Sequence, residues 1–69
     1  MTQKELAYVE DAIGHEDIMI KVISESTNYL EDDALITFMG KELKKHVNTK
    51  QELMTLLEDK SNEWWTNIK

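Results

Sequence analysis

The chain has 69 residues, no cysteine and a formal net charge of −6 at pH 7. A chain of this length has room for one small domain, expected here over residues 1–69, and it struggles to bury enough apolar surface to offset its conformational entropy. Since cysteine is absent, disulfides and thiolate zinc sites are excluded as sources of stability, and association between copies is the expected alternative.

Charge and hydropathy also argue against two classes of partner. Acidic residues are spread along the chain, and the densest basic group is Lys41, Lys44 and Lys45, interrupted by Glu42. A protein that binds duplex nucleic acid presents clustered Lys or Arg to the phosphates. No apolar run approaches the roughly 20 residues that cross a bilayer, and the first residues lack the pattern of a secretory leader. We therefore expect a cytoplasmic protein with neither a nucleic-acid nor a membrane partner.

The first predicted helix covers about residues 3–29. Proline is absent and glycine occurs only twice, in a chain rich in residues that favour helices. Thr2 can cap this helix, and Glu5 three residues later completes a capping box. Apolar residues then recur at the three-and-four spacing of one helical stripe. They are Leu6, Val9, Ile13, Ile20 and Ile23, widened by Ala12 and Met19.

A short turn and a second helix follow. The apolar pattern weakens at residues 27–30, where side chains gather that form competing local hydrogen bonds. Asp32 or Asp33 then offers an N-cap for a second helix over about residues 33–65. The stripe of this helix consists of Leu35 or Ile36, Met39, Leu43, His46, Leu53 and Leu56 or Leu57, with Ala34 and Phe38 beside it.

Two long helices joined by a few residues fold back antiparallel, because a parallel arrangement needs a longer crossover. With the turn centred near Glu31, the numbers of facing residues sum to about 63 if both helices rise alike. Leu6 then faces Leu57, Ile20 faces Leu43, and every apolar layer finds an apolar partner. The sequence thus predicts an all-α antiparallel helical hairpin, and its small size predicts that two hairpins dimerise into a four-helix bundle.

One polar layer interrupts the predicted seam. Glu16 lies on the first stripe between Ile13 and Ile20, and its facing partner is His46 or a neighbour of His46. Glu42 lies one turn before His46 on the same helix face. The sequence therefore predicts that Glu16, Glu42 and His46 converge inside the hairpin or at a dimer seam.

Three interpretations of this polar layer compete. The favoured one is a hydrogen-bonded Glu16–His46 pair that fixes helix register, with no cofactor. The second is half of a ferritin-type iron or manganese site, with Glu16, Glu42 and His46 as ligands, completed by a dimer. Against it, di-iron proteins use a Glu-x-x-His spacing, whereas three residues separate Glu42 from His46. Catalysis without metal is the third, but no nucleophile constellation or Gly-rich loop accompanies it. We expect no enzyme activity.

The C-terminal segment carries Trp64, Trp65 and Ile68. If facing residue numbers sum to about 63, these residues extend past Met1, so they have no residue of the helix predicted over residues 3–29 to pack against within their own hairpin. Exposed tryptophans are typical of association surfaces. We favour burial of Trp64, Trp65 and Ile68 against a second copy. Folding back over the end of the hairpin near Tyr8, and contact with a different protein, are the alternatives.

Three short motifs carry a family resemblance. They are KELAYVED at residues 4–11, the acidic turn after residues 26–28, and KHVNT at residues 45–49 followed by Leu53. Together they resemble the small spore coat F-like proteins of spore-forming Firmicutes, over about residues 4–58. The resemblance implies a ferritin-like helical unit without established catalytic residues, located in the spore coat or retained in the cell. Among the candidate site residues only His46 lies within these motifs, and the tryptophan pair lies outside them.

These observations predict a non-enzymatic, self-associating helical protein, a homodimer or higher homo-oligomer, as a spore-coat-like structural component. A ferritin-like metal-binding protein is the first alternative. The second is a small acidic module that binds another protein, which the net charge of −6 and the tryptophan pair support.

Overall fold

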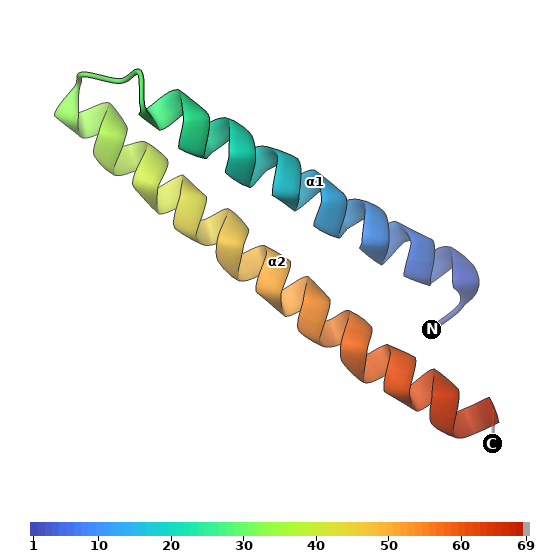
Figure 1. Ribbon diagram of the computed structural model, residues 1–69. Helices are drawn as coiled ribbons and strands as arrows, with labels where there is room; N and C mark the ends of the chain where they lie inside the picture. The colour runs from blue at the N-terminus through green and yellow to red at the C-terminus, as the bar shows by residue number, and fades with distance from the viewer. Residues whose placement is uncertain (69) are drawn as a thin grey trace.

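The computed structural model describes the backbone of residues 1–68 and the side chains of residues 1–59. Two helices, α1 (Gln3–Thr27) and α2 (Asp33–Ile68), lie side by side and antiparallel, joined by a short turn (Figure 1). The predicted all-α helical hairpin is therefore confirmed. Helix α1 ends two residues before the expected limit of 29, and α2 continues beyond the expected limit of 65.

Both helices begin at side-chain caps. The backbone N–H of Glu5 donates to the Thr2 hydroxyl at 3.0 Å, and the N–H of Thr2 donates to the Glu5 carboxylate at 2.9 Å, which completes the predicted capping box. At α2, the N–H of Leu35 donates to the Asp32 carboxylate at 3.0 Å. Of the two predicted caps, the structure uses Asp32.

Helix α1 ends where local hydrogen bonds change from helical to turn spacing. The Thr27 hydroxyl donates to the carbonyl of Ile23 at 2.7 Å. The backbone N–H groups of Tyr29 and Leu30 donate to the carbonyls of Ser26 and Thr27, three residues earlier, at 3.0 and 3.2 Å. This tightening ends the helix, and it explains why α1 stops short of the residue at which apolar periodicity alone would end it.

The two predicted apolar stripes form the seam between the helices. Ile23 is 5% exposed and is the only buried residue among those whose side chains are described. The sequence left two positions open, and the structure places Ile36 and Leu57 at the seam, while Leu35 and Leu56 are 51% and 44% exposed. The other half-buried apolar members of the stripes are Leu6, Val9, Ile13, Ile20, Met39, Leu43 and Leu53.

Helix α2 is longer than α1, with 36 residues against 25, and extends past the start of α1 (Figure 1). Trp64, Trp65 and Ile68 belong to this extension, but their side chains lie outside the described part of the chain. Their role at an interface therefore stays a prediction. Over the part of the chain that is described, neither helix combines the length and the apolar character needed to cross a membrane.

Both glycines lie inside helices, Gly14 in α1 and Gly40 in α2. A Cβ atom built at either position meets no neighbouring atom of the described residues within 4 Å. Close approach of the two helix backbones therefore does not require glycine at these positions. Each costs helix stability, about 1 kcal/mol relative to alanine, without a compensating contact inside the hairpin.

The burial pattern makes a direct prediction for two isoleucines of α1. Ile23→Ala removes the one side chain that is buried among the described residues and should lower the free energy of unfolding by about 2–4 kcal/mol. Ile18 is 60% exposed, so Ile18→Ala should lower it by less than about 1 kcal/mol. Urea denaturation followed by circular dichroism measures both values. Equal losses in the two variants would contradict the assignment of helix faces.

Candidate functional site

The centre of the seam holds a polar pair that joins the two helices. The ring N–H at Nδ1 of His46, on α2, donates to Oε2 of Glu16, on α1. The Glu16 side chain is 17% exposed and that of His46 is 25% exposed, so both are largely withdrawn from water. The facing arithmetic predicted this contact, and the structure confirms that Glu16 and His46 come together.

The surroundings of the pair explain why the two side chains must meet. Glu16 lies between Ile13 and Ile20 on the α1 stripe, and Leu43 precedes His46 on the α2 stripe. A partly buried carboxylate can only accept hydrogen bonds, and the imidazole supplies the N–H donor that it needs. If one helix slid by a turn, each polar group would face an apolar layer. The pair therefore favours a single register of α1 against α2.

Glu42, the third predicted ligand, does not join the pair. Its Oε1 lies 3.4 Å from Nζ of Lys45, three residues later on the same helix. Among the described residues, no three His, Asp or Glu side chains are grouped closely enough to hold a metal ion. Within one hairpin, the predicted ligand set thus reduces to Glu16 and His46. A metal site shared between copies stays a prediction.

An ion pair that sequence analysis missed lies beside the Glu16–His46 pair. Lys50 Nζ, on α2, contacts Oδ1 of Asp17, on α1. The signal was present in the sequence, because residue 50 falls at the three-and-four spacing between His46 and Leu53, where a seam residue is expected. Asp17 is 52% exposed, and solvent-exposed ion pairs contribute at most about 1 kcal/mol. The second pair makes the middle of the seam polar without stabilising it much.

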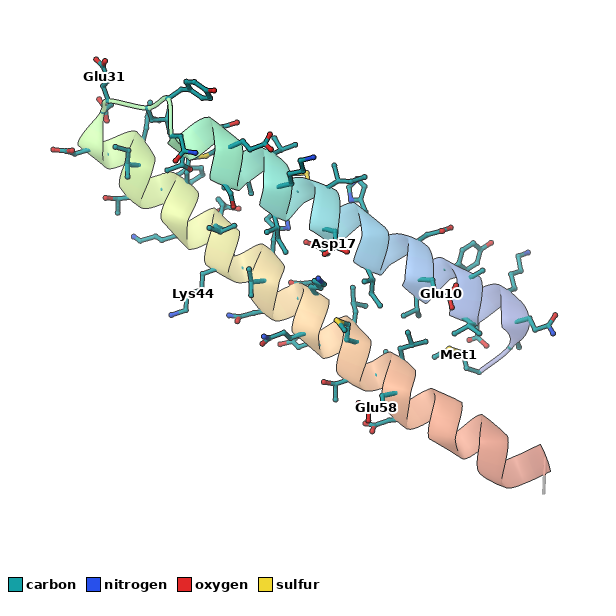
Figure 2. The ribbon with its side chains drawn as sticks, viewed as in Figure 1. Met1, Glu10, Asp17, Glu31, Lys44 and Glu58 are labelled. Carbon is teal, nitrogen blue, oxygen red and sulfur yellow. The ribbon has the colours of Figure 1, made fainter. Side chains whose placement is uncertain are left out.

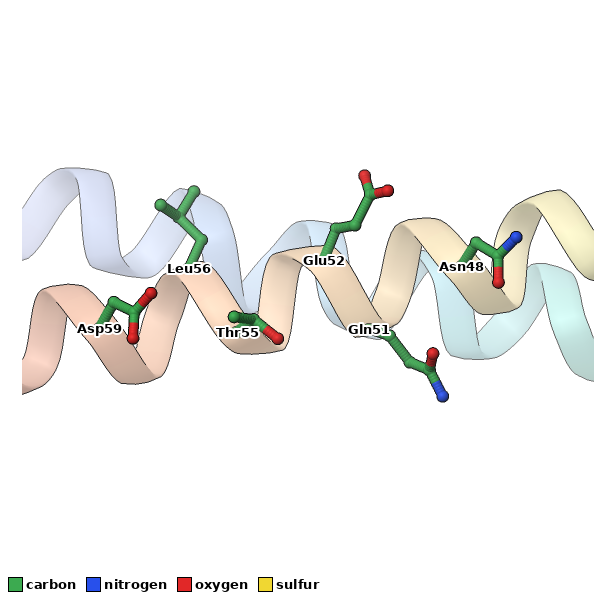
Figure 3. A pocket seen from close by; sticks show the side chains of 6 residues that line it. All are labelled: Asn48, Gln51, Glu52, Thr55, Leu56 and Asp59. Carbon is green, nitrogen blue, oxygen red and sulfur yellow. The ribbon is translucent and has the colours of Figure 1, made fainter.

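The depressions on the described surface are open and poorly suited to enclose a substrate. One of about 420 Å³ is lined by exposed side chains of α2 alone. Figure 3 shows Glu52 and Leu56 pointing to one side of that helix and Gln51 to the other. A second, of about 340 Å³, lies at the open end of the hairpin, and neither brings a nucleophile to a general base. The lining residues are Asn48, Gln51, Glu52, Thr55, Leu56 and Asp59 in the first, and Met1, Glu5, Val9 and Leu56 in the second.

Comparisons with family models, curated proteins and solved structures found no match for this chain. The resemblance to the spore coat F-like proteins therefore stays a prediction. Support for any function comes from the hairpin itself, that is, from its polar seam and its exposed apolar side chains.

The Glu16–His46 pair predicts an asymmetric response to substitution. Glu16→Leu or His46→Leu alone leaves one polar group unpaired in the seam, and each should lower the free energy of unfolding by about 1–3 kcal/mol. The double variant removes both desolvation penalties and fills the layer, so its stability should equal or exceed that of the wild type. Thermal and urea melts of the three variants measure this.

Glu10→Leu is the control, because Glu10 is exposed and does not lie on the seam. It should change stability by less than about 0.5 kcal/mol. Additive losses in the Glu16→Leu, His46→Leu double variant would contradict a paired role.

Proposed function

We propose that this chain is a non-catalytic helical module that functions by associating with copies of itself, two hairpins forming a four-helix bundle. One observation carries the proposal: Ile23 is the only buried residue of the described part, whereas large apolar side chains are 44–86% exposed. A soluble hairpin that left these side chains in water would forgo most of the hydrophobic stabilisation its sequence offers. The exposed residues are Tyr8, Ile18, Val22, Tyr29, Leu35, Phe38, Met54 and Leu56.

The total surface of the hairpin supports the same proposal. The chain exposes 5611 Å² at a mass of 8.1 kDa. A compact monomer of that mass exposes about 4,500 Å², which leaves an excess of about 1,100 Å² per chain. A standard protein interface buries about 800 Å² on each partner. The excess is therefore sufficient for one interface of ordinary size with a second hairpin.

Self-association also fits the structural role that the resemblance to spore coat F-like proteins implies. A coat component acts by assembling, so it needs surfaces that recognise copies and no enclosed substrate site. The open depressions and the apolar side chains of the hairpin suit that role. We propose the spore coat or the cytoplasm of a spore-forming cell as the location.

Ferritin-like metal binding is the second candidate function, and the Glu16–His46 pair favours it. A carboxylate and an imidazole facing each other across two helices are the ligand types that iron and manganese accept. Glu42 is 29% exposed and lies one turn from His46, so a different side-chain rotamer would bring a second carboxylate closer. The metal would replace the direct hydrogen bond between Glu16 and His46.

An acidic module that binds a different protein is the third candidate. The net charge of −6 supports it, and the same exposed apolar side chains would serve a foreign partner. The mass of the pure protein in solution distinguishes this candidate from the first, because a module that needs a different protein as its partner does not associate with itself.

Self-association predicts a concentration-dependent melting temperature. Sedimentation equilibrium of the wild-type chain should give twice the monomer mass, and the melting temperature should rise as protein concentration increases, since mass action favours the dimer. A monomer mass at every concentration, with a constant melting temperature, would overturn the proposed function.

The metal candidate predicts a different dependence. If iron or manganese binds, the melting temperature should rise with free metal concentration, and Glu16→Ala, Glu42→Ala and His46→Ala should each abolish the rise. Lys45→Ala serves as the control, because it removes the partner of Glu42 and retains all three ligands. Wild-type melting curves that coincide with and without Fe²⁺ and Mn²⁺ would exclude this candidate.

A further inference from the structure

Most of the exposed apolar side chains fall on one side of the hairpin. On α1, Tyr8 and Val22 are two helical heptads apart, so they form one line along the helix, with exposed His15 between them. On α2, Leu35 and Leu56 belong to one line in the same way. Both directly precede a seam residue, and Phe38 lies beside that line.

The two lines lie on the same side. An antiparallel helix pair has an approximate two-fold axis perpendicular to the plane of both helices, so equivalent positions relative to the seam face the same way. Glu5 directly precedes the seam residue Leu6, as Leu56 precedes Leu57, and Glu5 and Leu56 line the same depression. We call this side the apolar face. It carries Tyr8, Val22, Leu35, Phe38 and Leu56, with half-buried Ala12 and Met19 at its edge and with Glu5, the Glu42–Lys45 pair and Glu52 among them.

The opposite side, called here the polar face, differs in composition. It consists of residues that come directly after a seam residue in the sequence, as Asp17 comes after Glu16, and of their neighbours on the same side of each helix. The Asp17–Lys50 ion pair spans it, and Met54, at 50% exposure, is the one large apolar side chain that the described part exposes there. Figure 2 shows Lys44 directed away from α1 on the outside of α2. Apart from Met54, the polar face is thus suited to water, and the polar residues on it include Glu10, Lys21, Ser24, Thr37, Gln51 and Glu58.

We infer that the apolar face is the surface on which a second copy docks, and that the two hairpins run in opposite directions across it. This inference rests on the proposed self-association and specifies its interface. The Cα atoms span 56 Å by 15 Å in their two longest directions, a footprint of about 800 Å², which matches one partner's share of a standard interface. The apolar face is therefore large enough for one interface of ordinary size with a second copy.

Charge at the turn selects the opposite-direction arrangement. Glu31, Asp32 and Asp33 are consecutive and exposed, and Figure 2 shows Glu31 at the tip of the turn. Two hairpins aligned in the same direction would place both acidic turns side by side, where like charges repel. Running in opposite directions, the two turns lie at opposite ends of the bundle.

The unequal helix lengths favour the same arrangement. Helix α2 has 11 more residues than α1, an extension of about 16 Å. In hairpins of opposite direction, the extension of each copy lies along the partner's turn-proximal half of the apolar face. The part of the partner's α2 in that half carries Leu35 and Phe38. The extension of each copy thus covers apolar side chains that the partner's own two helices leave exposed.

A matched pair of charge substitutions tests the docking face. Phe38 and Met54 are 56% and 50% exposed, so glutamate at either position is tolerated by the single hairpin. Phe38→Glu, on the apolar face, should raise the dimer dissociation constant by about tenfold or more. Met54→Glu, on the polar face, should leave it unchanged within about twofold. Sedimentation equilibrium gives both constants, and far-ultraviolet circular dichroism confirms that both variants are helical.

A distance measurement on a chain that keeps the apolar face, Asp32 and Asp33 unchanged tests the direction. The chain has no cysteine, so Glu31→Cys carries a single spin label at the tip of the turn. In opposite-direction dimers the two labels should be about 55 Å apart, near the length of α2, whereas same-direction dimers give less than about 25 Å. Pulsed electron paramagnetic resonance resolves these values without altering the apolar face.

A short label distance, or a dimer that Met54→Glu dissociates and Phe38→Glu does not, would overturn this inference and leave the proposed self-association intact. A wild-type chain that stays monomeric would overturn both. The expected result is a dimer that only Phe38→Glu dissociates, with the long distance.

Discussion

Two helices can share only one seam, and this limit governs the rest of the structure. Each helix buries one stripe against the other, and at this chain length that leaves Ile23 as the single buried residue of the described part. The sequence nevertheless carries a second set of apolar side chains, including Val22, Phe38 and Leu56, outside the seam. The hairpin thus packs one apolar stripe and leaves another apolar face exposed to water. Packing against a second copy is the simplest way to bury that face.

The polar residues in the middle of the seam lower its stability and favour one register of α1 against α2. Glu16–His46 occupies a layer that apolar side chains could fill, and partly buried ion pairs seldom stabilise more than the apolar residues they replace. Apolar layers alone tolerate sliding, because one leucine or isoleucine packs against another with little preference. The polar layer therefore supplies specificity to a seam whose apolar part supplies most of the stability.

The features that periodicity and local chemistry determine were predictable from the sequence. The Thr2–Glu5 capping box, both stripes and the Glu16–His46 contact follow from spacing and from equal helical rise. Neighbouring residues differ by about 100° around a helix, so spacing alone could not choose Ile36 over Leu35. Spacing also does not determine a side-chain rotamer. Glu42 lies one turn from His46 on the same helix, yet its carboxylate bonds to Lys45 and not to the Glu16–His46 pair.

The direction of docking also bears on the metal candidate. With α2 of one copy running its full length along α2 of the other, the bundle's two-fold axis passes near residue 50, the midpoint of α2. The two copies of Glu42 are then about 25 Å apart along the bundle. Metal ions in a dinuclear site lie about 4 Å apart and share bridging ligands. Each half-site would thus have to bind its ion with Glu16, His46 and at most its own Glu42. Docking across the apolar face in opposite directions and a shared ferritin-type centre therefore exclude one another, so the spin-label distance at residue 31 bears on both.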